Sequence, residues 1–374
     1  MKVAFLLGSL HRGGAETLVL DVFKNASKAP FEMIGIHRKN GPYKEEFYAA
    51  GPKMIQCAPK RFGYLSYLCR LRKCLLKEKV TIVHAQQSID GIYARIATIG
   101  TGIKVITTFH GHMLADASWL QRKATYWANP KIICVSEYQK HYFEENWKLP
   151  KDNKLHVVYN GIDFGKIDNV KNKRVRELES EGVKLAMVGN FVKGRSQIVV
   201  AQALNKLKIE DWRLEKSFES SRDKKIDFYF IGRRDDSEPE RYDECVRYCE
   251  KKGLTNVHFL GGRNDVPSIL KSIDGFVYST EHDTFGIAVI EAIAAELPVV
   301  VNDWPVMKEV CGEENDGIRY FKTDDSDDAA AKIALLLKEI AKSKKVAKAN
   351  ANTVRSRFSI DQYINNLEKI YKTL

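Results

Sequence analysis

The fold of this chain is decided by residues 278–303, YSTEHDTFGIAVIEAIAAELPVVVND. The stretch starts at the end of an apolar run, residues 275–278, that is typical of a buried strand. A polar loop, a glycine (Gly286), a helical pattern and a second apolar run at 297–301 follow in that order. Strand, loop, helix and strand make one unit of an open parallel sheet, and such sheets bind ligands outside the carboxyl ends of their strands.

Two carboxylates lie in this stretch. Asp283 is at the tip of the loop, and Glu291 is expected about two turns into the helix, with seven residues between them. The backbone N–H groups of Phe285, Gly286 and Ile287 start the helix and suit a phosphate. Carboxylates cannot bind phosphate, but they accept hydrogen bonds from hydroxyls. The stretch therefore favours a ligand with both groups, such as a sugar nucleotide.

Strand and helix patterns alternate along two parts of the chain, which predicts α/β domains with doubly wound parallel sheets. The expected strands are residues 3–7, 33–37, 53–56, 81–84, 104–109, 131–135, 155–158, 184–188, 226–231, 257–260, 275–278 and 298–301. The expected helices include residues 16–26, 65–79, 139–146, 197–207, 241–251, 266–273 and 286–295, and the tail from residue 327 is helical, with its last helix at 360–371. Residues 160–182 are polar, and we interpret them as the link between two Rossmann-like domains that face a cleft. Residues 208–225 are interpreted as a surface insertion.

Composition limits the class of protein. The chain has 374 residues, and 44% hydrophobic residues are enough for a sizeable core. Lys and Arg exceed Asp and Glu by 60 − 48 = 12, which permits an anionic partner such as nucleic acid, anionic lipid or a nucleotide-linked substrate. No nucleic-acid reader motif or aromatic platform is present, so we expect no nucleic-acid partner.

Cysteine usage and hydropathy indicate a cytoplasmic protein. The seven cysteines are scattered without a C-x-x-C pair, which is typical of reduced thiols. Cys245 and Cys249 share a helix face, but no further ligands complete a metal set. No apolar run approaches the roughly 20 residues of a membrane span. The apolar run near the N-terminus is too short for a signal peptide, and a first buried strand is the better interpretation.

Two glycine-containing loops follow predicted strands. Gly13 and Gly14 follow the first strand and precede a helix, where backbone can approach a phosphate. Such a turn is as often a packing device. Residues 189–195, GNFVKGR, carry Lys193 and Arg195 and could grip a diphosphate. The alternative is a solvated basic loop.

Three further features have both a functional and a structural interpretation. His110 and His112 end the strand at 104–109; they lack a third metal ligand, and a polar contact to a sugar or acceptor is favoured. Residues 61–79 form a basic amphipathic helix that either flanks the sheet or contacts an anionic membrane surface. Residues 325–327, Asp-Ser-Asp, have the spacing of a metal-binding pair but look like a helix cap.

In this order the motifs resemble glycosyltransferase family 4, the retaining enzymes of the GT-B fold. The family's GGAE loop is similar to residues 13–16, and its segments that close the first domain are similar to 135–136 and 159–163. The family's nucleotide-base loop is similar to residues 259–261, which include Gly261, together with residues 265–266. Its Glu-x7-Glu motif corresponds to 283–291, and the C-terminal helix that crosses back begins at 358.

Two positions depart from the family pattern. The first acid is Asp283 instead of Glu, one methylene shorter; Glu281 would leave nine intervening residues. The family's Arg-x4-Lys phosphate clamp has Asn190 and Arg195 here, so one cation is lost, and Lys193 is the nearest replacement. These departures bear on donor affinity and on the choice of sugar.

The resemblance implies an acceptor-side domain, residues 1–163 completed by helix 358–374, and a nucleotide-sugar-binding domain, residues 164–357. The implied reaction is retaining transfer of a sugar from a nucleotide diphosphate sugar, with a UDP-sugar favoured. The acceptor would be a glycan or lipid-linked molecule in cell-surface polysaccharide synthesis. No metal or other cofactor is expected, and contact with an anionic membrane at the cytoplasmic face is an additional expectation.

The resemblance also implies roles for individual residues. Glu291 would accept from ribose hydroxyls, while Asp283 and the backbone of Phe285 and Gly286 would contact the sugar. Arg195, Lys193 and the Gly13–Gly14 loop would stabilise the diphosphate. The residues implied at the catalytic centre are His110, Asp283 and Arg195.

Two other classes of protein remain open at this level. The GT-B fold also hosts a sugar-nucleotide 2-epimerase, which would turn over the donor without an acceptor. The departures at Asp283 and Asn190 also fit a non-catalytic nucleotide-sugar-binding protein.

Overall fold

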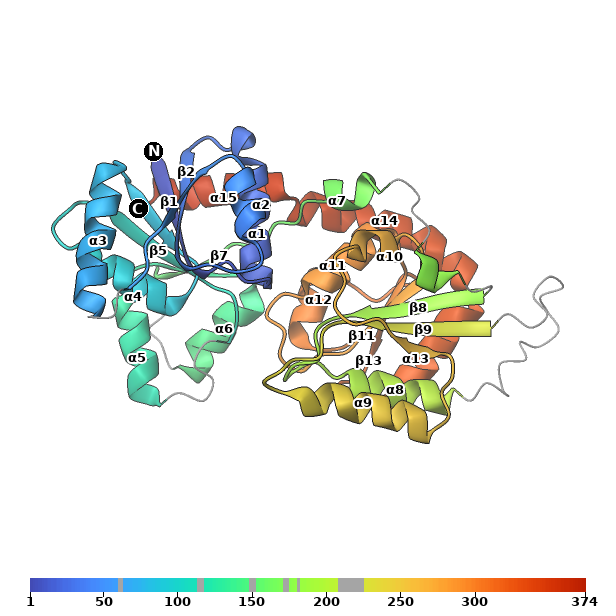
Figure 1. Ribbon diagram of the computed structural model, residues 1–374. Coiled ribbons are helices and arrows are strands. Elements are labelled where there is room, and N and C mark those ends of the chain that lie inside the picture. Colours follow the sequence, from blue (N-terminus) through green and yellow to red (C-terminus); the bar gives the residue numbers. More distant parts are fainter. Residues whose placement is uncertain (60–62, 113–117, 148–152, 171–174, 180–181, 208–224) are drawn as a thin grey trace. The chain divides into compact units, whose positions relative to one another are not determined.

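The computed structural model describes residues 1–59, 63–112, 118–147, 153–170, 175–179, 182–207 and 225–374 (Figure 1). Within them the chain folds as two compact units. Unit 1 comprises Met1–Asp163 with Phe358–Leu374, and unit 2 comprises Phe164–Arg357. Each unit is a parallel sheet with helices packed against it, which confirms the predicted fold class.

Unit 1 contains a seven-stranded sheet of order β3-β2-β1-β4-β5-β6-β7, in which all neighbours are parallel. Its strands are β1 (Lys2–Ser9), β2 (Glu32–Lys39), β3 (Lys53–Gln56), β4 (Ile82–Ala85), β5 (Lys104–Phe109), β6 (Ile132–Cys134) and β7 (Leu155–Val157). Its helices are α1 (Gly14–Lys24), η1 (Ala26–Lys28), α2 (Lys44–Ala49), α3 (Tyr64–Lys77), α4 (Ser88–Ala97), α5 (Trp119–Ala128), α6 (Glu137–Asn146) and α15 (Ile360–Lys372).

The two faces of this sheet pack into separate cores. Phe5 and Leu7 of β1 belong to one core, and Ala4 and Leu6 belong to the other. Side chains of a strand alternate between faces, so a strand covered on both faces must be apolar throughout. This is why the central strands were recognisable as continuous apolar runs.

The last helix of the chain completes unit 1. Leu367 of α15 is fully buried in a core shared with β1 and α1, and α15 packs beside α1 (Figure 1). The Tyr371 hydroxyl lies 2.6 Å from His84 Nδ1, and His84 Nε2 lies 2.7 Å from Thr108 Oγ1. Burial lowers the pKa of His84 to about 3. The neutral imidazole thus links α15 to β4 and β5.

Unit 2 contains a six-stranded sheet of order β10-β9-β8-β11-β12-β13, again with parallel neighbours throughout. Its strands are β8 (Gly182–Val188), β9 (Lys225–Ile231), β10 (Val257–Phe259), β11 (Gly275–Tyr278), β12 (Val299–Asn302) and β13 (Ile318–Phe321). Its helices are α7 (Gly165–Asp168), η2 (Arg176–Leu178), α8 (Gln197–Lys206), α9 (Pro239–Lys251), α10 (Val266–Leu270), α11 (Ile287–Ala294), α12 (Pro305–Cys311), α13 (Ser326–Lys338) and α14 (Ile340–Phe358).

The structure corrects the expected elements at β13 and in the segment 160–182. Strand β13 was not predicted. The segment 160–182, predicted to be only a link, contains α7 and η2, and Ile167 and Leu178 are buried. The predicted insertion at 208–225 lies outside the described residues, apart from Lys225. None of the described helices combines the length and apolar composition that crossing a bilayer requires.

Candidate active site

The predicted site of unit 2 lies where its strand order reverses. Chain order proceeds outward from β8 through β9 to β10 on one side and from β11 through β12 to β13 on the other. Ligands of open parallel sheets bind outside the carboxyl ends of the strands at such a switch point. Arg195 follows β8, and Asp283 follows β11, so the topology places both residues at this edge.

Arg195 and Asp283 form one polar cluster with Tyr278 and Thr280. The guanidinium is ion-paired with the Asp283 carboxylate at Oδ2 and donates to Thr280 Oγ1 over 3.3 Å. It also lies over the Tyr278 ring, 5.3 Å from the centroid, and the Tyr278 hydroxyl donates to Asp283 Oδ2 over 2.6 Å. The two residues were predicted to contact different parts of a donor, and the structure joins them directly.

The cluster keeps the Arg195 guanidinium protonated near the end of the sheet. Burial works against the charge of Arg195, but the Asp283 carboxylate more than offsets it and raises the guanidinium pKa. Burial raises the pKa of the fully enclosed Tyr278 well above its ordinary value, so its hydroxyl stays a donor. Arg195 keeps a quarter of its side chain exposed and Asp283 about an eighth, 25% and 12%. The cation is therefore both held in place and accessible.

Hydrogen bonds of backbone and side-chain groups connect the loop of Arg195 to the loop of Asp283. Glu281 N donates to Gly194 O over 2.9 Å, and Thr280 Oγ1 donates to the same carbonyl over 2.8 Å. Gly194 has a φ of +85°, and a Cβ there would come within 2.2 Å of His282 Cβ. Ser196 Oγ adds a 2.5 Å hydrogen bond to Glu281. Glycine is required at 194 because both its conformation and the close approach exclude a side chain.

Asn302 and Trp304 support the same loop and were not predicted. Asn302 Oδ1 accepts from Thr280 N over 2.9 Å, and its Nδ2 donates to Thr280 O over 2.7 Å. Trp304 Nε1 donates to Asp283 O over 3.1 Å. Asn302 is fully buried at the end of β12. In the sequence, the only signal for this role of Asn302 is a polar amide at the end of the apolar run 299–301.

Asn190 and Gly261 of the predicted donor site follow β8 and β10, next to the residues that follow β9. Asn190 Oδ1 accepts from Arg233 N over 3.0 Å, and Gly232 N donates to Gly261 O over 2.9 Å. The Arg233 stem packs on Gly262, where a Cβ would come within 2.3 Å of Arg233 Cγ. Asn190 thus orders neighbouring backbone, and the exposed Arg233 is a further cation at this edge, one that sequence reasoning missed.

Lys193 is exposed in the loop between β8 and α8. Its backbone N–H donates to Glu238 Oε2 over 2.6 Å. The backbone contact fixes the loop, while the ammonium group lies at the surface, where it can reach a ligand.

Helix α11 begins as predicted but places Glu291 differently. Gly286 is its N-cap in the left-handed conformation, with φ +85°, and a Cβ there would come within 2.6 Å of Met307 Cε. Phe285 is buried and Ile287 is the first helical residue. Because the helix starts at Ile287, the half-buried Glu291 lies one turn from the start and not two. It is therefore nearer to the N-terminal N–H groups than expected.

The predicted residues of unit 1 lie at the carboxyl ends of its strands. Gly13 is the N-cap of α1 and Gly14 its first residue, and a Cβ on Gly13 would come within 2.5 Å of Glu16 Oε2. His110 follows β5, with Nε2 3.0 Å from Gln86 Oε1. Burial lowers the pKa of His110 to about 4, so the ring is neutral at physiological pH.

Local contacts show the surroundings of the residues that were considered as metal ligands. His112 is buried with its ring centroid 4.2 Å from that of Tyr142. Asp325 caps α13 by accepting from Asp327 N and Asp328 N, at 3.0 and 2.9 Å. Cys245 and Cys249 are both buried in α9. Among the residues that the structure describes, no group of three or more His, Cys, Asp or Glu side chains has the arrangement of a metal site.

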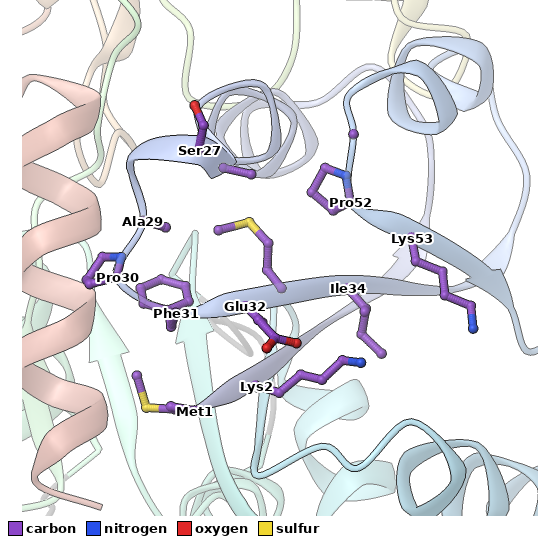
Figure 2. Close-up of a pocket in the computed structure, with 13 residues that line it drawn as sticks. Met1, Lys2, Ser27, Ala29, Pro30, Phe31, Glu32, Ile34, Pro52 and Lys53 are labelled. Atoms are coloured by element: carbon purple, nitrogen blue, oxygen red, sulfur yellow. The ribbon is translucent and has the colours of Figure 1, made fainter.

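A hollow of about 750 Å³ occurs elsewhere in unit 1 (Figure 2). Met1, Lys2, Phe31, Glu32, Pro52 and Lys53 are among its lining residues. These residues lie at the amino ends of β1, β2 and β3, opposite to the edge where parallel sheets bind ligands. The Lys53 ammonium is paired with Glu78 at 2.7 Å. The hollow therefore has no part in the candidate site.

Family models match almost the whole chain. A Glycosyltransferase Family 4 model matches residues 12–166, and a Glycosyl transferases group 1 model matches residues 168–353. The chain therefore belongs to the group 1 glycosyltransferases, as its motifs predicted.

Individual relatives and structures agree with this assignment. The chain is 28% identical over 251 residues to the UDP-Gal:alpha-D-GlcNAc-diphosphoundecaprenol alpha-1,3-galactosyltransferase of Escherichia coli, covering 63% of this chain and 61% of that protein. It is 20% identical to the O-antigen biosynthesis glycosyltransferase WclY of Escherichia coli, covering 83% and 82%.

Two solved structures have the same fold over essentially the whole chain. The glycosyltransferase from Rickettsia africae has a TM-score of 0.82 and 19% identity, covering 100% of this chain and 98% of that one. HepE of Anabaena, solved in complex with UDP and glucose, has a TM-score of 0.82 and 16% identity, covering 100% of both.

Proposed function

We propose that this glycosyltransferase moves a sugar from a UDP-sugar to a lipid-linked acceptor in the synthesis of a cell-surface polysaccharide. The observation that carries the proposal is the Arg195 guanidinium, held at the switch point of unit 2 by Asp283 and Tyr278. Two similar proteins support it: HepE has been solved with UDP and glucose, and the Escherichia coli galactosyltransferase is named for a diphosphoundecaprenol-linked acceptor.

Arg195 acts on the charge that develops when the sugar leaves UDP. Breaking the bond between the anomeric carbon and the diphosphate oxygen puts negative charge on the diphosphate. A guanidinium fixed in advance stabilises that charge without reorganising at the moment of reaction. Lys193 and Arg233 add cations at the same edge. We propose that these groups replace a divalent metal.

The other predicted residues bind and orient the donor. Glu291 accepts from the ribose hydroxyls, and the N–H groups at the start of α11 face the sugar and phosphates. Asp283 holds Arg195 through Oδ2, which leaves Oδ1 for a sugar hydroxyl. The neutral His110 contacts the acceptor or the donor sugar, and the Gly13–Gly14 loop approaches the diphosphate. An acceptor hydroxyl attacks the anomeric carbon on the face from which UDP departs, its proton passes to the departing diphosphate oxygen, and the anomeric configuration is retained.

A layer of three helices in unit 1 fits an anionic membrane surface. Helix α3 contacts α4, and α4 contacts α5. Tyr67, Leu71 and Leu75 of α3 pack into the core, so the helix flanks the sheet. The layer also exposes apolar side chains: Tyr64, Leu65, Leu76, Ile89, Ile96, Trp119, Leu120 and Trp127. Lys73 and Lys77 of α3 are also exposed. Aromatic and basic side chains together are typical of interfacial binding, and we propose that this layer brings the active site to a lipid-linked acceptor.

Transfer assays test the proposal. Purified protein is incubated with radiolabelled UDP-sugars, with and without a short-chain prenyl diphosphate-linked sugar and with and without EDTA. We expect an acceptor-dependent, EDTA-resistant product with the donor's anomeric configuration. Conversion of the donor without an acceptor would instead indicate the epimerase, and the absence of any turnover would contradict the proposal.

A further inference from the structure

Unit 1 has an arginine–aspartate pair at the switch point of its own sheet. The strand order reverses between β1 and β4. Arg38, on β2, reaches across the carboxyl end of β1 to Asp90 on α4, with Nε 2.7 Å from Oδ1. Its guanidinium lies over the Tyr93 ring, 5.6 Å from the centroid. The pair lies where an open parallel sheet binds its ligand.

Most N–H donors of the Arg38 guanidinium have no hydrogen-bond acceptor among the described residues. In the described part of the chain, Asp90 is the one hydrogen-bond acceptor of Arg38, and it receives only Nε. Both amino groups, with four N–H donors, remain for a ligand. The Arg38 side chain is 15% exposed, whereas that of Asp90 is 0% exposed. Arg38 is therefore the accessible member of the pair, and Asp90 holds it.

Gly8 makes room for the guanidinium at the end of β1. A Cβ at this position would come within 2.8 Å of Gln87 Oε1, 3.0 Å of Arg38 Nη2 and 3.3 Å of Asp90 Oδ2. A side chain there would displace the Arg38 amino group.

Polar groups behind the pair also have unmet hydrogen-bonding capacity. Tyr67 Oη and Asp90 Oδ2 are enclosed, and neither has a hydrogen-bond partner among the described residues. Enclosed polar atoms without a partner are rare in folded proteins. The described residues therefore do not complete the hydrogen bonding of the groups around this pair.

The same arrangement occurs in unit 2, where the donor site is proposed. There Arg195 pairs with Asp283, lies 5.3 Å from the Tyr278 centroid, and passes Gly189 at the end of β8. Each unit thus combines an arginine, an aspartate, a tyrosine ring and a glycine at its switch point. Because Arg195, the cation of this set, binds a diphosphate in the proposed function of unit 2, Arg38 of unit 1 fits the same chemistry.

We propose that Arg38, held by Asp90, binds a second diphosphate group in unit 1. The proposal rests on the proposed function, in which both substrates carry a diphosphate. That group belongs either to the lipid-linked acceptor or to the UDP-sugar. Arginine recognises it through paired N–H donors, which a lysine cannot reproduce.

Isothermal titration tests the site without turnover. Inorganic pyrophosphate is titrated into protein saturated with UDP, and UDP is titrated separately. The test variant is Arg38→Gln with Asp90→Asn, which removes both charges and avoids a lone enclosed carboxylate. Arg95→Gln, an exposed arginine of α4, is the matched control. Circular dichroism melting checks folding, and Arg38→Lys gives a second comparison that keeps the charge next to Asp90.

We expect the double variant to lose at least about tenfold in one of the two affinities, since hydrogen bonds to charged groups contribute this much. Loss of pyrophosphate binding alone assigns the site to the acceptor, and loss of UDP binding assigns it to the donor. If both affinities match those of the wild type and of Arg95→Gln, the proposal is overturned. Because no turnover is needed, this result is independent of whether sugar transfer is found.

Discussion

At the scale of residues, Arg195 and Asp283 work as a pair. They lie on loops after different strands, yet one ion pair and the Tyr278 hydroxyl join them. The sequence indicated both residues through their loops and their family motif. It could not indicate the pairing, because contact between distant loops depends on the topology of the sheet. The side chain of Asp283, one methylene shorter than the Glu of the family motif, is the one that accepts the hydrogen bond from Tyr278.

A double-mutant cycle tests this pairing. Arg195→Gln, Asp283→Asn and the combined variant are compared by kcat/KM with a UDP-sugar. We expect the effects to be non-additive by about 1–3 kcal/mol in transition-state free energy, since either single change already removes the ion pair that the two residues share. The exposed pair Arg234–Asp243 in the same unit is the matched control and should show almost no coupling. Additive effects at Arg195 and Asp283 would contradict the pairing.

The enclosed histidines predict how stability depends on pH. The pKa of His84 is lowered to about 3 by burial, against about 6.5 in an unfolded chain. Between these values the unfolded state binds more protons, so the free energy of unfolding falls as pH decreases below 6.5. From pH 7.5 to 5 the loss from His84 is about 2 kcal/mol. Thermal melting of His84→Gln should show a lower melting temperature than the wild type at pH 7.5, but a melting temperature that depends less on pH. If the melting temperature of the variant depends on pH as steeply as that of the wild type, His84 is not the group responsible.

At the scale of elements, buried apolar strands were the most predictable features. The predicted bounds of β5 and β11 agree with the structure, because these strands are short and almost entirely buried. The bounds of β3 agree as well, although half of its residues are polar and none is buried. Strand β13 escaped prediction because it contains Arg319, a charge in an apolar run. The structure explains it: Arg319 donates to Glu339 Oε2 over 2.7 Å and to Ser343 Oγ over 3.0 Å. Glu339, which is distant in the sequence, offsets the free-energy cost of burying the Arg319 charge. The residues next to Arg319 in the sequence give no indication of this partner.

The start of α11 depends on glycine at position 286. Alanine there would strain the left-handed backbone by about 1–2 kcal/mol and also press against Met307, which adds about 1–3 kcal/mol. The control is Gly253→Ala, because Gly253 also has positive φ, +66°, but nothing within 4 Å of a Cβ. Urea unfolding should therefore show a larger loss for Gly286→Ala than for Gly253→Ala. Equal losses would mean that close packing at the start of α11 is unimportant.

At the scale of the whole molecule, two sheets of similar topology each carry a cation at their switch point. The alternation of strands and helices was enough to predict two doubly wound units, and the family motifs located the loops. Local patterns did not reveal Arg38, Asn302 or Arg233, since their roles depend on partners from other elements.

The central claim is that Arg195 of unit 2 binds the diphosphate of a UDP-sugar, and UDP affinity tests it most directly. Isothermal titration compares the wild type, Arg195→Gln and the matched surface variant Arg234→Gln. The account predicts that UDP binds the wild type and Arg234→Gln alike, and that Arg195→Gln binds at least about tenfold more weakly. Equal affinity in all three proteins, or no UDP binding by the wild type, would contradict it.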